Sequence, residues 1–309
     1  MRTLNHRQLL GFRAVMVTGS MTGAGKILHL SQPAVTRLIK DLERELDLPL
    51  FIRTGVAVKP TQQALELFRE VERYFNGVDR IVETAGYLRN RRGGRLRIAA
   101  MSTLSSRSLP EAIHRFKQIE PELDFYVHSD TSHHILDAVQ RNEFDIGFGR
   151  VPAERTDIEH LPMPTSSAIC LVPRHHRLAA KESISVTDLH REQLISLGTS
   201  SLLRLQIEAA LESAGVRGGT VIQTLFSNTV PSYVARGLGI GVTDIFSVLG
   251  ADRTNIVVRR FAPELAFDFS AIFPRSEHSP LAIAFARTML NVVANDIAEV
   301  EVALQSVRS

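Results

Sequence analysis

The stretch LSQPAVTRLIKDLE, residues 30–43, predicts a helix whose start and buried face are both explained by its residues. Ser31 can accept a hydrogen bond from the first free backbone N–H groups, and Pro33 suits the first turn because it has no N–H to satisfy. Apolar residues recur at spacings of three and four, which makes one buried stripe. This stripe consists of Val35, Leu38, Ile39, Leu42 and Leu46. The polar face opposite needs another explanation.

Short helices and a β-ribbon are predicted on either side of this stretch. A first helix ends near Gly19, and Ser20 opens a short second one in which Ile27 and Leu28 are expected to point inward. After residue 49, two strand-like runs flank a tight turn at Thr54-Gly55. Two short helices, a longer third one and a ribbon indicate a winged helix-turn-helix over residues 1–61, with the helix-turn-helix at 20–39. The apolar face of the first helix is Leu9, Leu10, Phe12, Val15 and Met16.

The polar face of the third helix is explained if this unit reads DNA. The third helix of such a unit lies in the major groove with its N-terminal side chains at base edges. Gln pairs with adenine, Arg pairs with guanine and Thr contacts the thymine methyl, whereas basic residues on the ribbon neutralise phosphates. A solvated helix face is the alternative, which we disfavour because the cap, the preceding helix and the ribbon agree. The expected DNA-binding residues are Ser31, Gln32, Pro33, Thr36, Arg37, Lys40, Arg53 and Lys59.

The charge of the chain is unevenly distributed along its 309 residues. Residues 1–93 contain 15 Lys and Arg against 9 Asp and Glu, a net charge of +6, whereas the remainder carries −3. A basic N-terminal third is typical of a segment that meets a polyanion such as DNA. The alternative is that the charges of a solvated surface are unevenly distributed by chance, and the net charge alone does not exclude this alternative.

Residues 62–90 are predicted to form one long linker helix. Its apolar residues recur at alternating spacings of three and four, as in a coiled-coil seam. A helix of this length runs about 40 Å, so we favour pairing with a second copy over folding back onto its own domain. RNRRGG at 89–94 is then predicted to be a hinge. The seam consists of Phe68, Val71, Phe75, Val78, Val82 and Ala85.

From residue 95 onwards, predicted strands alternate with predicted helices, which is typical of an α/β domain. RLRIAAM (95–101) begins a first cycle of strands and helices, and QLISL (193–197) begins a second. Two such halves in tandem predict a bilobed, periplasmic-binding-protein-like effector domain over 91–309. The expected boundaries are about 95–167 and 272–309 for lobe I and about 168–271 for lobe II.

A small-molecule site is expected between these lobes. In open α/β sheets, ligands lie at the carboxyl ends of strands, where helix N-termini offer free N–H groups to anions. Hydroxyls and backbone donors follow several of the predicted strands, which suits a carboxylate, although Ser and Thr there are often only helix caps. The expected effector is a small zwitterionic or anionic amino-acid derivative. The candidate effector-binding residues are Ser102, Thr103, Thr131, Arg150, Thr199, Ser200, Phe226 and Asn228.

Catalytic and metal chemistry is not indicated. The His133-His134 and His175-His176 pairs are sequence neighbours without metal-ligand spacing, so surface or turn positions are expected. GLGIG (237–241) precedes a predicted strand, whereas a dinucleotide-binding motif follows one. No arrangement of Ser, His and Asp resembles a known catalytic motif. We therefore expect no catalytic residue, no metal and no cofactor.

Cysteine usage and hydropathy favour a cytoplasmic protein. The single cysteine, Cys170, excludes an internal disulfide framework and lies in a predicted buried strand. The N-terminus lacks the apolar core of a signal peptide, and no stretch is expected to reach the roughly 18 to 20 apolar residues of a membrane span.

SMTGAGKILHLSQPAVTRLIKDLERELDLPLF (20–51) resembles the signature of LysR-type transcriptional regulators. The likeness runs over the whole chain and includes RLRIAAMS (95–102), FDIGFG (144–149), HRLA (176–179) and ARGLGIGVTD (235–244). IVETAGYLR, EQLISL and IVVRRF are most similar to the opine-responsive members and to the activator that gives the family its name.

The resemblance implies winged-helix DNA binding at imperfect palindromes, dimers through the linker helix, assembly into homotetramers, and control by an effector between the lobes. It supports Ser102, Thr103, Thr131 and Thr199 most directly. Gly25 departs from the family pattern, where helix two usually carries alanine, and with Gly23 it should cost that helix about 1–2 kcal/mol.

These observations predict a sequence-specific transcriptional regulator whose oligomer geometry is controlled by an amino-acid or opine-like metabolite. A small-molecule binding protein without DNA function is the first alternative. An enzyme in the α/β domain is the second, and the missing catalytic constellation disfavours it.

Overall fold

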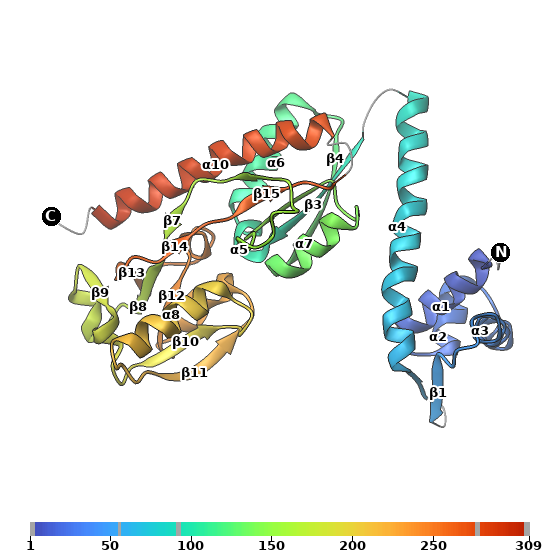
Figure 1. Ribbon diagram of the computed structural model, residues 1–309, viewed down its shortest axis with the longest axis horizontal. Helices are drawn as coiled ribbons and strands as arrows, with labels where there is room; N and C mark the ends of the chain where they lie inside the picture. The colour runs from blue at the N-terminus through green and yellow to red at the C-terminus, as the bar shows by residue number, and fades with distance from the viewer. Residues whose placement is uncertain (1–3, 55–56, 91–93, 276–278, 306–309) are drawn as a thin grey trace. The chain divides into compact units, whose positions relative to one another are not determined.

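The computed structural model describes residues 4–54, 57–90, 94–275 and 279–305. The chain divides into two compact units, Met1–Arg89 and Asn90–Ser309, each with its own core (Figure 1). The N-terminal unit contains α1 His6–Thr18, α2 Met21–Leu28, α3 Gln32–Leu46, β1 Phe51–Thr54, β2 Ala57–Pro60 and the long α4 Gln62–Asn90.

The helix α3 begins as its sequence predicts. The Ser31 side chain accepts a hydrogen bond from the backbone N–H of Ala34 at 3.3 Å, and Pro33 lies in the first turn. The buried side of α3 includes Val35 and Leu42, both fully shielded from solvent. The predicted start and core face of this helix are therefore confirmed.

The inward face of α2 differs from the prediction. Ile27 is 59% exposed, so its expected inward orientation is wrong. The residues that face the core are Met21 and Ala24, with Leu28 packed partly against it. These positions follow the helical spacing of three and four from Met21, which places Ile27 on the opposite side of this short helix.

The apolar seam of the linker helix α4 is buried in its first half and exposed to solvent in its second half. Val71 and Phe75 are buried in the core of the N-terminal unit, which corresponds to folding back onto the helix's own domain. Farther along, the seam residue Val82 is 66% exposed, and its neighbour Ile81, which lies outside the predicted seam, is 70% exposed. The first half of the seam therefore stabilises the unit itself, and only the second half leaves apolar side chains uncovered.

Two large sheets, of five and six strands, define two lobes in the described part of the C-terminal unit. The first lobe has the strand order β4-β3-β5-β15-β6 and the second has β11-β10-β12-β8-β13-β9. In the first lobe, β3 lies parallel to both β4 and β5, which is the predicted β-α-β-α-β arrangement. The first lobe contains β3 Arg95–Met101, α5 Ser102–Ser105, α6 Ser108–Ile119, β4 Asp124–Asp130, α7 Ser132–Gln140, β5 Ile146–Gly149, β6 His160–Pro162 and β15 Ser270–Ile272.

The chain passes between the lobes twice, through the short strands β7 Ser166–Ser167 and β14 Ala266–Phe267, which pair with each other in antiparallel fashion. The second lobe carries the remaining strands and short helices. These are β8 Ile169–Pro173, η1 Arg177–Ala180, β9 Ser183–Ser185, η2 Val186–Leu189, β10 Gln193–Leu197, α8 Leu202–Ser213, β11 Gly219–Thr224, η3 Ser227–Thr229, α9 Val230–Val234, β12 Ile240–Thr243, η4 Ile245–Val248 and β13 Ile256–Ala262.

The closing helix, α10 Pro280–Gln305, contradicts the expectation that no stretch of the chain is long and apolar enough to span a membrane. By length and composition alone it could cross a membrane, although such a test is also passed by core helices of soluble proteins. Its buried face packs into the domain core, with Phe285 and Met289 fully shielded. Asp296 on the same helix is buried and accepts a 2.7 Å hydrogen bond from Ser108. These contacts identify α10 as a core helix of the C-terminal unit.

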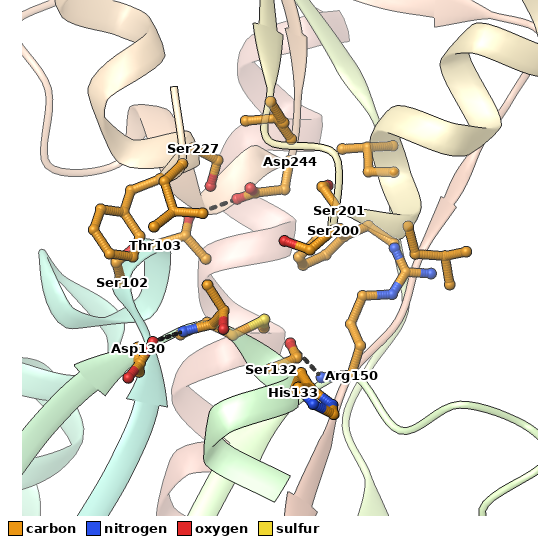
Figure 2. Close-up of a pocket in the computed structure, with 18 of the residues that line it drawn as sticks. Ser102, Thr103, Asp130, Ser132, His133, Arg150, Ser200, Ser201, Ser227 and Asp244 are labelled. Carbon is orange, nitrogen blue, oxygen red and sulfur yellow. Dashed lines mark hydrogen bonds between the residues drawn. The ribbon is translucent and has the colours of Figure 1, made fainter. Parts of the chain in front are cut away.

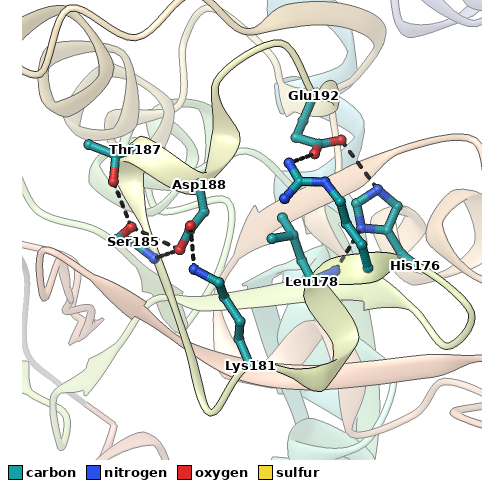
Figure 3. Close-up of polar contacts among 8 residues, drawn as sticks. His176, Leu178, Lys181, Ser185, Thr187, Asp188 and Glu192 are labelled. Atoms are coloured by element: carbon teal, nitrogen blue, oxygen red, sulfur yellow. Dashed lines mark hydrogen bonds and ion pairs between the residues drawn. The ribbon is translucent and has the colours of Figure 1, made fainter.

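The HRLA segment has a structural role in the second lobe (Figure 3). The Nδ1 atom of His176 accepts a hydrogen bond from the Leu178 backbone N–H at 3.3 Å, so its proton is on Nε2, which lies 3.2 Å from a Glu192 oxygen. Nearby, Lys181 donates to Asp188 at 2.5 Å. This network holds η1 and the following turn in place.

Candidate functional site

A cavity of about 220 Å³ lies between the two lobes of the C-terminal unit (Figure 2). Its walls come from the residues that follow β3, β4 and β5 in one lobe and β10, β11 and β12 in the other, as expected for a ligand site at the carboxyl ends of strands. The lining residues are Met101, Ser102, Thr103, Asp130, Thr131, Ser132, His133, Leu136, Arg150, Val151, Pro152, Leu197, Ser200, Ser201, Leu202, Leu203, Leu225, Phe226, Ser227, Asp244 and Phe267.

A buried carboxylate joins the two lobes at this cavity. Thr103, at the start of α5, donates a 2.7 Å hydrogen bond to the Asp244 carboxylate, and the Ser247 backbone N–H donates to the same oxygen at 3.0 Å. Both side chains are buried. Burial raises the pKa of Asp244, and hydrogen bonds from Ser227, Thr103 and Ser247 oppose this rise.

Arg150 supplies the positive charge of the cavity. Its side chain is only 12% exposed, and its Nη2 atom donates to Asp268 at 2.7 Å. The guanidinium lies 5.3 Å from the centre of the Phe267 ring. Burial lowers the pKa of Arg150, while the charges of Asp268 and Asp244 act in the opposite direction. The remaining nitrogens, Nε and Nη1, are buried without a hydrogen-bond partner.

Asp130, at the end of β4, contributes a second carboxylate. It accepts a 2.7 Å hydrogen bond from the Thr131 backbone N–H and lies 3.0 Å from Nδ1 of His134. Burial raises the pKa of Asp130, but these hydrogen bonds and a further one from His128 outweigh burial and lower the pKa below its ordinary value. Asp130 is therefore ionised at neutral pH.

The structure brings together most of the predicted effector residues. Thr199 and Asn228 lie outside the residues that line the cavity; Thr199 is exposed, and Asn228 donates to the Ser106 hydroxyl at 3.5 Å. The predicted residues that line the cavity are Ser102, Thr103, Thr131, Arg150, Ser200 and Phe226.

Sequence reasoning missed the two carboxylates, Asp130 and Asp244, and the aromatic Phe267. Asp130 and Asp244 each come directly after or at the end of a strand, the same signal that identified the hydroxyl residues. Phe267 lies on the crossing strand β14, and no local pattern indicated its position.

The predicted DNA-binding residues of α3 are exposed, except Thr36, which is half-buried. Arg37 has an 87% exposed side chain and lies 3.9 Å from Asp41, and Gln32 donates to the Thr36 hydroxyl at 3.0 Å. On the ribbon, Lys59 is exposed. Arg53 belongs to β1, and its side chain is outside the described part of the structure. Ser31, Pro33 and Lys40 are also exposed.

The described residues contain no candidate metal site and no cysteine suited to nucleophilic chemistry. Within that part of the chain, no cluster of three or more His, Cys, Asp or Glu side chains could hold a metal ion. Cys170 is fully buried on β8, and burial raises the pKa of its thiol. A buried thiol with a raised pKa is a poor nucleophile.

Comparison with known proteins matches both units to one family. Residues 6–65 match the model of the bacterial regulatory helix-turn-helix protein, lysR family, and residues 89–294 match the LysR substrate binding domain. The chain belongs to the LysR family of transcriptional regulators. It is a DNA-binding regulator with an effector-binding domain, and the predicted fold class is confirmed.

Two relatives and one solved structure illustrate the likeness to LysR-family members. The regulatory protein NocR of Agrobacterium fabrum is 35% identical over 93% of this chain and 96% of its own length. The octopine catabolism/uptake operon regulatory protein OccR of Rhizobium meliloti is 36% identical over 78% of this chain and 80% of its own. Full-length CbnR complexed with its target DNA has the same fold, with a TM-score of 0.76, 21% identity and coverage of 94% of this chain and 100% of that one.

Proposed function

We propose that this LysR-family regulator reads its operator with the N-terminal end of α3, and that an effector in the cavity between the lobes changes the geometry of its oligomer. The observation that carries the effector part is a cavity with polar groups from both lobes, spanned by the Thr103–Asp244 hydrogen bond. A ligand that contacts both lobes stabilises one interlobe arrangement by its differential affinity for it.

An amino-acid derivative or an opine-like metabolite fits the cavity. The lining contains one guanidinium and two carboxylates beside several hydroxyls and an apolar wall. A volume of about 220 Å³ corresponds to roughly seven waters at about 30 Å³ each, which is the size of a small amino-acid derivative. The relative OccR is named for an octopine operon, which supports testing opines first.

The exposed half of the α4 seam supports a homodimer. Ile81 and Val82 are large apolar side chains on the outer part of a long helix, and a second copy of α4 would cover them by coiled-coil packing. Two such dimers would form the homotetramer that we propose, bound to an imperfect palindrome on double-stranded DNA. We place this assembly in the cytoplasm, where its operator would be, and assign it no enzymatic reaction.

An electrophoretic shift assay distinguishes this proposal from a binding protein without DNA function. The purified protein should shift a fragment from the region upstream of its own gene, and Arg37→Ala should weaken this binding by about 1–3 kcal/mol. If the protein shifts no fragment from this upstream region, the alternative of a small-molecule binding protein without DNA function is favoured. Turnover of a metabolite by the same preparation would favour an enzyme.

Calorimetry against a panel of amino acids and opines, octopine included, tests the effector class. Because Ser102 lines the cavity and Thr199 does not, Ser102→Ala should weaken binding of the compound that binds, whereas Thr199→Ala should not. Absence of binding by every panel compound would refute the class, and loss of binding in Thr199→Ala alone would refute the placement.

A further inference from the structure

A second cavity, of about 330 Å³, lies in the C-terminal unit between β13 and the C-terminal end of α10. Among the described strands, β9 pairs only with residues 260–262 of β13, which leaves residues 256–259 with an open edge. The described residues that line this cavity differ entirely from those of the cavity between the lobes. Its apolar wall consists of Val248, Ile256, Val257, Val258, Val300 and Leu304.

Three arginines give this second cavity an excess of positive charge. Arg174, Arg253 and Arg259 line it, and no acid is among the described residues that do. None of the three forms an ion pair with an acid in the described part of the chain. The chain beyond residue 93 carries a net charge of −3, so this excess is local. Guanidinium groups gathered in one cavity repel one another, and a bound anion relieves that repulsion.

The carboxylates on the adjoining segments are engaged by other residues. Glu299 and Glu301 lie on α10, and Asp252 precedes Arg253 in the chain. The pKa of Glu299 is lowered first by its hydrogen bond with Arg107 and only in the last place by the charge of Arg253. The hydrogen-bond partners are Arg107 for Glu299, Arg260 for Glu301, and Thr254 for Asp252.

Arg259 is a half-buried charge whose hydrogen bonds go to carbonyl oxygens. Its Nη1 donates to the Val258 oxygen at 2.9 Å, and its Nη2 donates to the Ala179 oxygen at 2.7 Å. Burial lowers the pKa of Arg259, because the charged form loses hydration there without gaining a counter-ion. Arg259 therefore contributes positive charge to the cavity, while its terminal nitrogens are already occupied.

Arg253 and Arg174 have donors left for a ligand. The side chain of Arg253 is exposed and donates to no described residue. Arg174 uses Nε for the Thr254 oxygen at 2.6 Å and Nη2 for the oxygens of residues 253 and 256. These bonds fix the plane of the Arg174 guanidinium and leave its Nη1 without a partner in the described part of the chain.

We propose that this cavity binds a small organic phosphate, with the phosphoryl oxygens accepting from Arg253 and Arg174 and the organic part against Ile256 and Leu304. A phosphate monoester carries nearly two negative charges at neutral pH, which suits three guanidinium groups better than one carboxylate does. The volume corresponds to about eleven waters at about 30 Å³ each, the size of an aryl or sugar phosphate. This ligand is a second input to the regulator, separate from the effector between the lobes.

Calorimetry of the full-length protein with phenyl phosphate, at constant ionic strength against chloride, tests the site. Wild type and the control Arg217→Gln should bind equally, because Arg217 is an exposed arginine outside the cavity. Arg253→Gln should weaken binding at least about tenfold through loss of charge-assisted hydrogen bonds, and Arg253→Lys should recover only part of the loss. Failure of the wild type to bind, or equal binding by Arg253→Gln, would overturn the proposal.

Further probes distinguish the ligand chemistry and the location of the site. Inorganic phosphate, which lacks an apolar part, and benzoate, which has a single charge, should each bind more weakly than phenyl phosphate. Equal affinity for benzoate would overturn the phosphate assignment. Arg253→Gln should bind a random DNA duplex as the wild type does, and a loss there would show that the arginines contact DNA instead. Loss of phenyl phosphate binding in Lys59→Ala but not in Arg253→Gln would place the probe on the DNA-binding unit and overturn the site.

Discussion

Thr103 and Asp244 lie in different lobes, and the 2.7 Å hydrogen bond between them is buried at the wall of the cavity. The bond therefore serves two purposes, since it partly compensates the buried carboxylate and joins the lobes where a ligand would enter. Its properties lead to a prediction about stability and pH.

Replacing Thr103 with valine should lower the free energy of unfolding by about 1–3 kcal/mol at neutral pH, because Asp244 loses a donor while it stays buried. Burial raises the folded-state pKa of Asp244. The cost of ionising it is therefore absent below its unfolded pKa, near 3.8, and develops as the pH rises through the folded pKa. Urea denaturation at several pH values should show a smaller difference between Thr103→Val and wild type in acid. A difference independent of pH would contradict this account.

Substitutions on the DNA-binding face should separate base recognition from phosphate contact. We expect Arg37→Ala to cost about 1–3 kcal/mol in affinity for the operator and to relax its sequence preference. Lys59→Ala should instead weaken binding to all sequences and reduce the slope of log affinity against log salt by about one. Fluorescence anisotropy on operator and random duplexes at several salt concentrations measures both effects. Equal salt slopes for wild type and Lys59→Ala would argue against a phosphate contact.

Alanine at Gly25 and at Gly77 should change stability in opposite directions. A Cβ at Gly25 would lie 2.6 Å from the backbone oxygen of Leu30, so Gly25→Ala must displace the turn between α2 and α3. At Gly77 in α4 no atom lies within 4 Å of that position, and Gly77→Ala should stabilise the helix by about 0.5–1 kcal/mol. Thermal melting compares the two variants. A higher melting temperature for Gly25→Ala would show that helix propensity outweighs the contact with Leu30.

The exposed half of the α4 seam should control oligomerisation. Ile81→Asp and Val82→Asp place a charge on the surface that we assign to a second copy, so each should shift the protein toward monomers in sedimentation velocity at micromolar concentration. Val302→Asp is the matched control because Val302 is a 65% exposed valine on α10. If all three variants sediment like the wild type, another surface joins the subunits.

The order of helices and strands followed from the sequence because most elements carry local signals. Ser31 and Pro33 mark the start of α3, and the β-rich runs of the effector domain became strands at the expected places. Local signals do not include contacts that form only in the folded chain. The cost assigned to Gly25 by helix propensity ignores Leu30, which only the folded turn brings close.

The sequence predicted where the candidate site lies, but it did not predict all of the charged and aromatic residues that line it. Ser102 and Arg150 were found because each follows a strand of the first lobe. Asp244 also follows a strand and carried the same signal, whereas Phe267 approaches the site only because the chain crosses between the lobes and returns, which no local pattern encodes. The orphaned nitrogens of Arg150 likewise emerge only from a full account of its packing.

The helix α10 is attached to both lobes. On the first-lobe side, Arg107 pairs with Asp296 and Glu299, and on the second-lobe side, Arg260 of β13 pairs with Glu301, all three acids being carried by α10. Asp296 and Glu301 are five residues apart, about 7.5 Å along the helix axis, so both lobes are tied to the same short stretch of α10. Any change in the angle between the lobes would therefore have to strain or break one of these two sets of ion pairs.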